Sequence, residues 1–362
     1  VLADRCSRKK LLALGLAING LGFVLLGLAP TYPLAIAAVV LAGVGGSFFH
    51  PAATSLIAGL FPVNTGRALG LLGVGASAGF FAGPIYCGWR THMLMPVLGS
   101  AAWRRPMLEL GILAIAYAII FAWLADDEKP ESTVARSHGS KVPMFPTPAL
   151  WGIFLVTCVI FSLRDFAGNG MGTLGSLFMQ KVHGLDVEKT GMMLSFIFAG
   201  TWISNPLFGG LSDSGRNRWI SVVLVLAALM MAAFPHVSRG WLLPLLVTYG
   251  FFFLASYPMV EAALMQSVPA AVRGRVFGLF ITVGGLIGNL SHWALGELVR
   301  KLGSHATERG SYVPVFGAMG LAIIVSLAGL VGLHAVRRRE DLAAGGAHAE
   351  IHEPANPTLA KS

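Results

Sequence analysis

Long apolar stretches, separated by short polar segments, make up most of this sequence. A helix needs about 20 apolar residues to cross a bilayer core about 30 Å thick. We find ten stretches of this kind, and each predicts one membrane-spanning helix. They are residues 11–29, 34–61, 66–89, 105–125, 149–180, 190–211, 219–235, 241–268, 275–299 and 313–336. The pattern therefore predicts an all-α membrane protein.

Two polar regions divide this pattern into parts. Residues 126–148 contain the run DDEKPESTVARSHGSK and are interpreted as a cytoplasmic linker between two helix bundles. The bundles are then residues 1–125 and 149–336. Residues 337–362 open with RRRED and continue with Ala, Gly, His and Pro, which predicts a disordered cytoplasmic tail.

An internal repeat relates the two bundles. Five pairs of residues recur 207 to 209 positions apart, and an accidental match of this regularity is improbable. The pairs are Asp4 and Asp213, Arg8 and Arg216, Pro51 and Pro258, Pro62 and Pro269, and Gly66 and Gly274. The repeat predicts two pseudo-symmetric halves in parallel, an arrangement known for transporter folds.

The same repeat predicts that helices precede the first residue. Two spans, 149–180 and 190–211, come before Asp213, whereas three residues come before Asp4. About 60 residues, or two helices, are therefore expected before Val1. Ten of twelve helices in a six-plus-six bundle would then be present, in a parent protein of roughly 420 residues, and the ten-helix chain alone is expected not to transport.

Composition supports a membrane protein and excludes soluble classes. Of the 362 residues, 55% are hydrophobic and 12% are charged, whereas a soluble domain carries about 25% charged residues. The formal charge of +9 would suggest nucleic acid for a soluble protein, but basic cytoplasmic loops explain it here, so no nucleic-acid partner is expected. Cys6, Cys87 and Cys158 have no disulfide or zinc spacing.

The distribution of basic residues predicts the orientation. If residues 5–10 are cytoplasmic, 16 of the 26 Lys and Arg lie in cytoplasmic segments and 9 in external ones. The exceptions are Arg90, Arg104 and Arg105, which fall on the external side. We therefore expect an integral protein of the bacterial inner (plasma) membrane with both native termini in the cytoplasm.

Three segments resemble motifs of the major facilitator superfamily. The loop LADRCSRK resembles the motif between that family's second and third helices, with Ser7 replacing Gly, and a degenerate copy lies at 213–216. The pattern from Gly70 to Gly88 resembles the fifth-helix motif often found in antiporters, with Cys87 replacing a Gly. GVGGSFFHPAA more narrowly resembles the fosmidomycin-resistance-like branch of drug exporters.

This resemblance implies helices three to twelve of a secondary transporter. Proton-coupled drug antiporters of the superfamily usually carry an Arg in the fourth helix, four residues before the Gly that corresponds to Gly43. This chain has Val39 at that position, which argues against proton coupling by that route.

The repeated charged loop is interpreted as a conformational gate. A carboxylate such as Asp4 can bond the unpaired N–H groups at the start of a neighbouring helix, and such a contact breaks when the bundles rock. Gly79 and Gly83 would allow close helix packing, and Pro84 a bend. Positive-inside charge without gating is the alternative. The residues assigned to the gate are Asp4, Arg5, Arg8, Asp213, Arg216, Gly79, Gly83 and Pro84.

Arg164 and Asp165 are the clearest charges inside a predicted span. Ionisable groups in the bilayer core are costly and usually mark a pathway. Because neighbouring residues point about 100° apart, one of the two is expected to line a cavity while the other pairs with a neighbouring helix. Arg164 suits an anionic substrate and Asp165 a proton, and Asn169 lies in a Gly-Asn-Gly loosening of the helix. An internal salt bridge that only fixes packing is the alternative.

Four more residues are candidates for a substrate or proton pathway. Glu261 follows Tyr257 in one span and is expected either to face the cavity or to extend toward the headgroups. His50 lies opposite Tyr257 in the repeat, and His292 lies inside another span. Histidine titrates in the range that suits proton coupling, although a packing role is the alternative.

The sequence predicts a secondary active transporter, and motifs for ATP use, metal binding or hydrolysis were not found. Proton-coupled efflux of a small organic compound or drug by alternating access is favoured. Uptake of an organic anion by symport is one alternative, and a non-transporting sensor or assembly partner is another. We expect a small-molecule substrate, protons and the lipid bilayer as partners, a monomer, no cofactor and no enzymatic activity.

Overall fold

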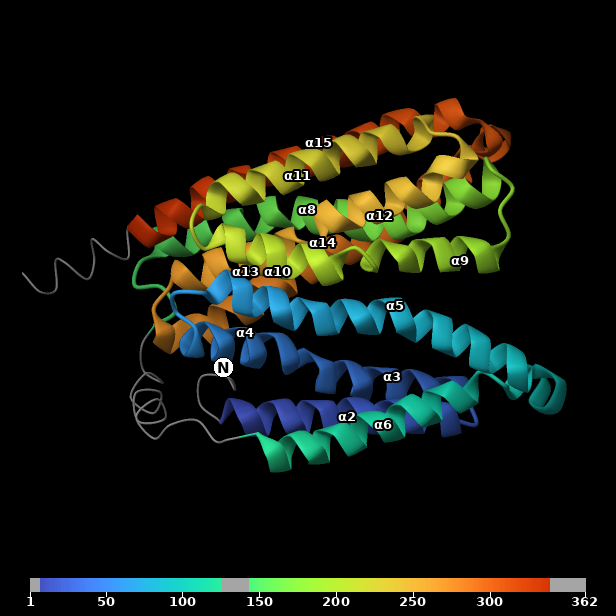
Figure 1. The fold of residues 1–362 in the computed structure, drawn as a ribbon, viewed down its shortest axis with the longest axis horizontal. Coiled ribbons are helices and arrows are strands. Elements are labelled where there is room, and N and C mark those ends of the chain that lie inside the picture. The colour runs from blue at the N-terminus through green and yellow to red at the C-terminus, as the bar shows by residue number, and fades with distance from the viewer. Residues whose placement is uncertain (1–6, 126–142, 339–362) are drawn as a thin grey trace, which may run out of the picture.

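The computed structural model describes residues 7–125 and 143–338, which form two groups of roughly parallel helices (Figure 1). The first group comprises α2 (Arg8–Leu28), α3 (Tyr32–Ser47), α4 (Phe49–Leu60), α5 (Thr65–Leu98) and α6 (Arg104–Leu124). The second comprises α8 (Pro148–Lys181), α9 (Val187–Ser195), α10 (Thr201–Ser212), α11 (Arg216–Ala233), α12 (Leu242–Phe253), α13 (Ser256–Gln266), α14 (Arg273–Lys301), α15 (Val313–Ser326) and a last helix at 328–338.

Within these described residues, nine helical segments are long and apolar enough to cross a membrane. The predicted all-α membrane fold is therefore confirmed. The tenth expected span, 190–211, is divided into α9, a short 3₁₀ turn and α10. The helix is interrupted next to Gly200. A Cβ atom there would lie 3.1 Å from Cβ of Phe251, so α12 packs closely against the interruption. The expected linker falls mostly on 126–142 and the tail on 339–362, outside the described residues.

The two halves repeat the same helix breaks. The span at 34–61 is split between α3 and α4, and the span at 241–268 is split between α12 and α13. Each break lies about one turn before a proline, Pro51 or Pro258, because proline has no N–H to donate to the preceding turn. The paired prolines of the repeat thus produce paired broken helices.

Glycines bring the halves together at the end of the bundle where α10 ends and α11 begins, which we call the Asp213 end. A Cβ atom on Gly66 would lie 2.5 Å from the carbonyl oxygen of Gly209, and one on Gly70 would collide with the carbonyl of Asn205. Helix α5 therefore meets α10 backbone to backbone. Toward its other end α5 bends away from α9 (Figure 1).

The packing expected at Gly79 and Gly83 is wrong for this conformation. Apart from the adjacent turns of its own helix, a Cβ atom on either residue would meet no atom of the described residues within 4 Å. Pro84 also lies inside an uninterrupted α5, which runs past the predicted end at residue 89. The close approach is made instead by Gly66 and Gly70, about two and a half to five turns earlier, because the halves meet near the start of α5.

Three arginines that fall on the predicted external side have partners close by in the first half. Arg104 Nη1 donates to the carbonyl oxygens of Gly27 and Ala29, 3.2 and 2.5 Å away, which caps the end of α2. Arg90 forms an ion pair with Glu109 at 2.7 Å, and Arg105 lies 3.6 Å from the same carboxylate. Their positions are thus explained by helix capping and pairing.

We expect Arg104→Ala to lower the free energy of unfolding by about 1–2 kcal/mol, since it removes charge-assisted bonds to two helix-end carbonyls. Arg105→Ala is the matched control, because this more exposed side chain has only the long contact with Glu109. Thermal unfolding of the purified protein in detergent measures both. Equal melting temperatures for the two variants would contradict the capping role.

Candidate functional site

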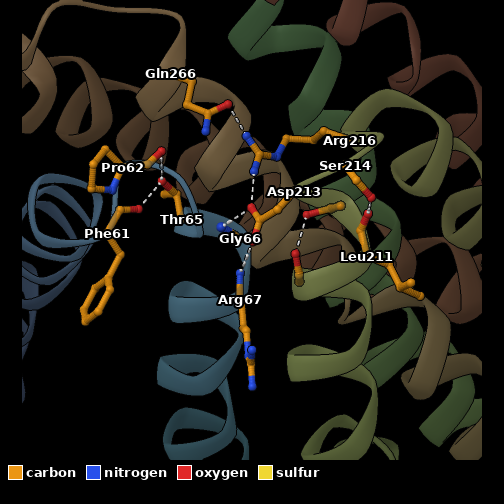
Figure 2. A network of polar contacts seen from close by, with 12 residues as sticks. Phe61, Pro62, Thr65, Gly66, Arg67, Leu211, Asp213, Ser214, Arg216 and Gln266 are labelled. Carbon is orange, nitrogen blue, oxygen red and sulfur yellow. Dashed lines mark hydrogen bonds and ion pairs between the residues drawn. The ribbon is translucent and has the colours of Figure 1, made fainter.

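The carboxylate of Asp213 joins the two halves at the Asp213 end (Figure 2). Its two oxygens accept hydrogen bonds from the backbone N–H groups of Gly66, at 2.8 Å, and Arg67, at 3.1 Å. These amides lie in the first turn of α5, where a helix has unpaired N–H donors and a partial positive charge. A residue of the second half therefore caps a helix of the first half.

Arg216 completes this network. Its Nη2 atom lies 2.7 Å from Oδ1 of Asp213, and Nη1 donates to the side-chain oxygen of Gln266 at the end of α13 (Figure 2). Both partners of the ion pair are largely buried, at 11% exposure. Asp213 thus receives donors from α5 and α11, and Arg216 extends the contact to α13.

The other predicted gate residues are placed differently. Asp4 and Arg5 lie outside the described residues. Arg8 is 8% exposed and donates to the backbone oxygen of Ser55 at 3.2 Å, so it links α2 to α4 within one half. Of the predicted gate residues that the structure describes, Asp213 and Arg216 are the two that come together.

A cavity of about 510 Å³ lies between the halves. Its walls are mostly apolar and come from α4 and α5 of the first half and from α8, α9, α10, α12, α13, α14 and the 3₁₀ turn Phe196–Phe198 of the second half. Aromatic rings contribute much of the surface, and Phe80 of α5 stacks on Phe198 of the second half with centroids 5.0 Å apart. The aromatic residues of the wall are Phe49, Phe80, Phe198, Tyr249, Phe253 and Tyr257. Such a space suits a small organic molecule.

Five residues of the predicted pathway line this cavity: His50, Asn169, Tyr257, Glu261 and His292. The structure therefore brings together residues that are more than 240 positions apart in the sequence.

Arg164 and Asp165 are not among the lining residues, and they bind each other. The guanidinium donates to Oδ1 of Asp165 at 2.9 and 3.1 Å, and its carbon lies 4.1 Å from the ring centroid of Tyr257. The expectation that the two would serve different faces is wrong. The Arg164 side chain is long enough to fold back around its helix, and it is buried at 2% exposure behind the Tyr257 ring.

Glu261 is the single acidic side chain among the residues that line the cavity, and no Lys or Arg accompanies it there. Its Oε2 atom accepts a hydrogen bond from Thr54 Oγ1 at 3.5 Å, the long limit for such a bond. Thr54 belongs to α4 and Glu261 to α13, so this contact also crosses between the halves.

The two cavity histidines have different surroundings. Nδ1 of His292 lies 2.6 Å from the hydroxyl of Thr173, which joins α14 to α8. His50 lies against the rings of Phe49 and Phe277, with centroid distances of 5.3 and 6.3 Å. His292 is thus held by a polar contact, and His50 by aromatic ones.

Three polar residues of the site were not predicted from the sequence. Asn205 and Tyr249 are 3% and 2% exposed and line the cavity, yet Oδ1 of the first and the hydroxyl of the second have no hydrogen-bond partner among the described residues. Thr54 is the third. A polar residue in an apolar span was the available signal for Asn205, whereas threonine and tyrosine are common in membrane helices and give no such signal.

A family model described as the Major Facilitator Superfamily matches residues 1–292, which is most of the sequence. The chain belongs to this superfamily. The resemblance inferred from the motifs is thereby confirmed. The protein is an integral membrane protein and a secondary transporter of small-molecule substrates, and it is not an enzyme.

Named relatives include drug-resistance proteins. The sequence is 25% identical over 312 residues to multidrug resistance protein 2 of Bacillus subtilis, covering 83% of this chain and 75% of that protein. It is 24% identical over 308 residues to the fosmidomycin resistance protein of Escherichia coli, covering 80% and 72%. The crystal structure of the human organic anion transporter MFSD10 matches with a TM-score of 0.66 at 15% identity, covering 91% and 78%, which shows a shared fold.

We expect Asp213→Asn to shift the protein away from the conformation described here, because the amide loses the charge that binds Arg216 and the start of α5. Distances between labels on the two halves at the Asp213 end should lengthen, as measured by pulsed electron paramagnetic resonance.

Asp186→Asn is the matched control for this change. Asp186 also accepts from a first-turn amide, that of Lys189, and pairs with the residue three positions on, but both partners lie in one half. Its bond to the Lys189 amide holds the pKa of the Asp186 carboxyl below its usual value. A similar response from both variants would contradict a gating role for Asp213.

Proposed function

We propose that this protein exports a small organic compound in exchange for protons by alternating access. The observation that carries the proposal is the aromatic cavity between the halves, which contains one carboxylate and is lined by Leu69, one turn after Gly66 of the Asp213 contact. The drug-resistance relatives support export of an organic compound. In this proposal the described conformation is the one closed at the Asp213 end, and transport requires the Asp213 bonds to break.

The gate proposed at Asp213 rests on two bonds between the halves, from the amides of Gly66 and Arg67 to the Asp213 carboxylate. Separation of α10 from α5 would leave the Asp213 carboxylate with Arg216 and expose the amides of Gly66 and Arg67. Water can replace these partners once that end opens, so the cost of opening is moderate.

Glu261 is the better candidate than Asp165 for the coupling proton. Asp165 accepts two bonds from a buried guanidinium, and protonation would leave Arg164 with an uncompensated charge, which is costly in a protein interior. Glu261 lines the cavity, and its partner Thr54 is a neutral hydroxyl at the long limit of bonding. It can therefore take up and release a proton with less disturbance of its neighbours.

The alternative of organic-anion uptake receives less support from the geometry. It relied on Arg164 to neutralise the solute, and that guanidinium is buried, paired with Asp165 and covered by Tyr257.

We also propose a location in the bacterial inner membrane as a monomer, with the Asp213 end and both native termini on the cytoplasmic side, as the basic residues predict.

Transport in right-side-out vesicles that carry the full-length protein tests the exchange of solute for protons. The solute is first chosen by a growth screen of overexpressing cells against toxic compounds. Acid outside the vesicles should then drive the solute out in exchange and inward in symport. Entry of the solute under this gradient would overturn the proposal of export.

Glu261→Gln is expected to reduce pH-driven transport at least about tenfold while leaving the unfolding temperature nearly unchanged, since the residue's partner is neutral. Asp165→Asn should instead destabilise the protein by about 3 kcal/mol, because a buried arginine loses its partner. Vesicle transport and thermal unfolding distinguish the two. Intact pH-driven transport in both variants would show that neither carboxylate carries the proton.

The unpartnered polar atoms of Asn205 and Tyr249 are proposed to bind the solute. Asn205→Ala and Tyr249→Phe should each weaken solute binding about 3- to 10-fold, the equivalent of one lost hydrogen bond. Tyr312→Phe is the control, since this buried tyrosine donates to the carbonyl of Ala306 away from the cavity. Binding is measured by titration of the purified protein, and unchanged affinity in both cavity variants would remove these residues from the site.

A further inference from the structure

The hydrogen bond between Thr54 and Glu261 joins two residues that the internal repeat relates to each other. They are 207 positions apart, the same separation as Pro51 and Pro258 on the same two helices. In a pseudo-symmetric protein, two equivalent positions come into contact only where both lie next to the symmetry axis. This bond therefore lies close to the axis on which the two halves meet.

Both partners are on short helices that follow a break. Thr54 is on α4, which has 12 residues, and Glu261 is on α13, which has 11. Thr54 is 1% exposed, so its hydroxyl has little access to water, whereas Glu261 lines the cavity. The carboxylate is therefore the member of the pair that a proton can reach, and the hydroxyl is the member that is fixed by packing.

Among the described residues, Thr54 is the neutral hydroxyl that donates to Glu261 from the other half. Helix α8 contributes Arg164 and Asp165, which satisfy each other, and the interface contact of α11 is Arg216, which binds Asp213 and Gln266. Helices α5 and α10 contribute uncharged side chains to the cavity wall. The remaining titratable groups on the wall are His50 of α4, Tyr249 of α12, Tyr257 of α13 itself and His292 of α14.

We propose that Thr54 is a positioning residue that links the protonation of Glu261 to the closing of the Asp213 end. The link rests on the proposed function, in which Glu261 carries the proton. The Thr54 hydroxyl donates to the ionised carboxylate while the halves are together, and this donor is withdrawn when α4 and α13 separate. Because such coupling is reciprocal, release of the proton favours the closed arrangement, and opening favours uptake of a proton.

The test measures closing as a function of pH in the full-length protein. Cysteines at Val63 and Asn217, both exposed near the Asp213 end and in opposite halves, carry spin labels in a background without native cysteines. In the wild-type sequence the short label distance should become more populated as pH rises through one midpoint. Glu261→Gln should remove this dependence.

Thr54→Val keeps the shape of the side chain and removes its hydroxyl, and Thr54→Ser keeps the hydroxyl. The valine variant should move the midpoint upward by about 0.5–1 pH unit, a 3- to 10-fold change in proton affinity, because the ionised form loses a donor in the closed state. The serine variant should keep the wild-type midpoint. Thermal unfolding confirms that both variants are folded.

Two outcomes would overturn the role of Thr54: equal midpoints in the valine, serine and wild-type proteins, or a label distance that does not respond to pH. The vesicle assay reports separately on the proposed function. Proton-driven export that persists with equal midpoints rejects the Thr54 link and leaves the export proposal standing. Absence of proton-driven flux in the wild-type protein rejects the export proposal itself.

Discussion

The bonds from Asp213 to the first amides of α5 are the interaction on which the described arrangement of the two halves depends. A helix start has N–H groups without partners in the helix itself, and water, a capping side chain or another segment must satisfy them. Here the partner comes from the other half of the molecule. The same carboxylate also neutralises Arg216, so one side chain fixes the relative position of three helices.

Near the cavity, where water is scarce, a buried charge is stabilised by a partner of opposite charge. Arg164 and Asp165 neutralise each other beside the Tyr257 ring, which leaves Glu261 as the acidic group on the cavity wall. A paired charge is costly to disturb, and a carboxylate with a neutral partner is cheaper to titrate. The proposed division between a structural carboxylate, Asp165, and a titrating carboxylate, Glu261, follows from this difference in partners.

The helices and the repeat could be predicted from the sequence because both depend on local patterns, namely apolar length and paired prolines and glycines. The breaks before Pro51 and Pro258 fell inside single predicted spans, since apolar composition does not distinguish one long helix from two short ones. The pairing of Arg164 with Asp165 was missed because the direction of the Cβ atoms does not fix where a long guanidinium ends. Thr54 was missed because only the meeting of the halves makes it a neighbour of Glu261.

The backbone contact between α5 and α10 affects the energetics of a moving interface. Glycine has no rotamers, so ordering or releasing Gly66, Gly70 and Gly209 changes side-chain entropy very little. Two surfaces of this kind have few interlocking side chains. They therefore offer little steric resistance to separation, and little side-chain entropy is gained when they separate. In the proposed transport cycle, the preference between conformations then depends on the few polar contacts at the edge of this surface, where one proton or one bound molecule is enough to change it.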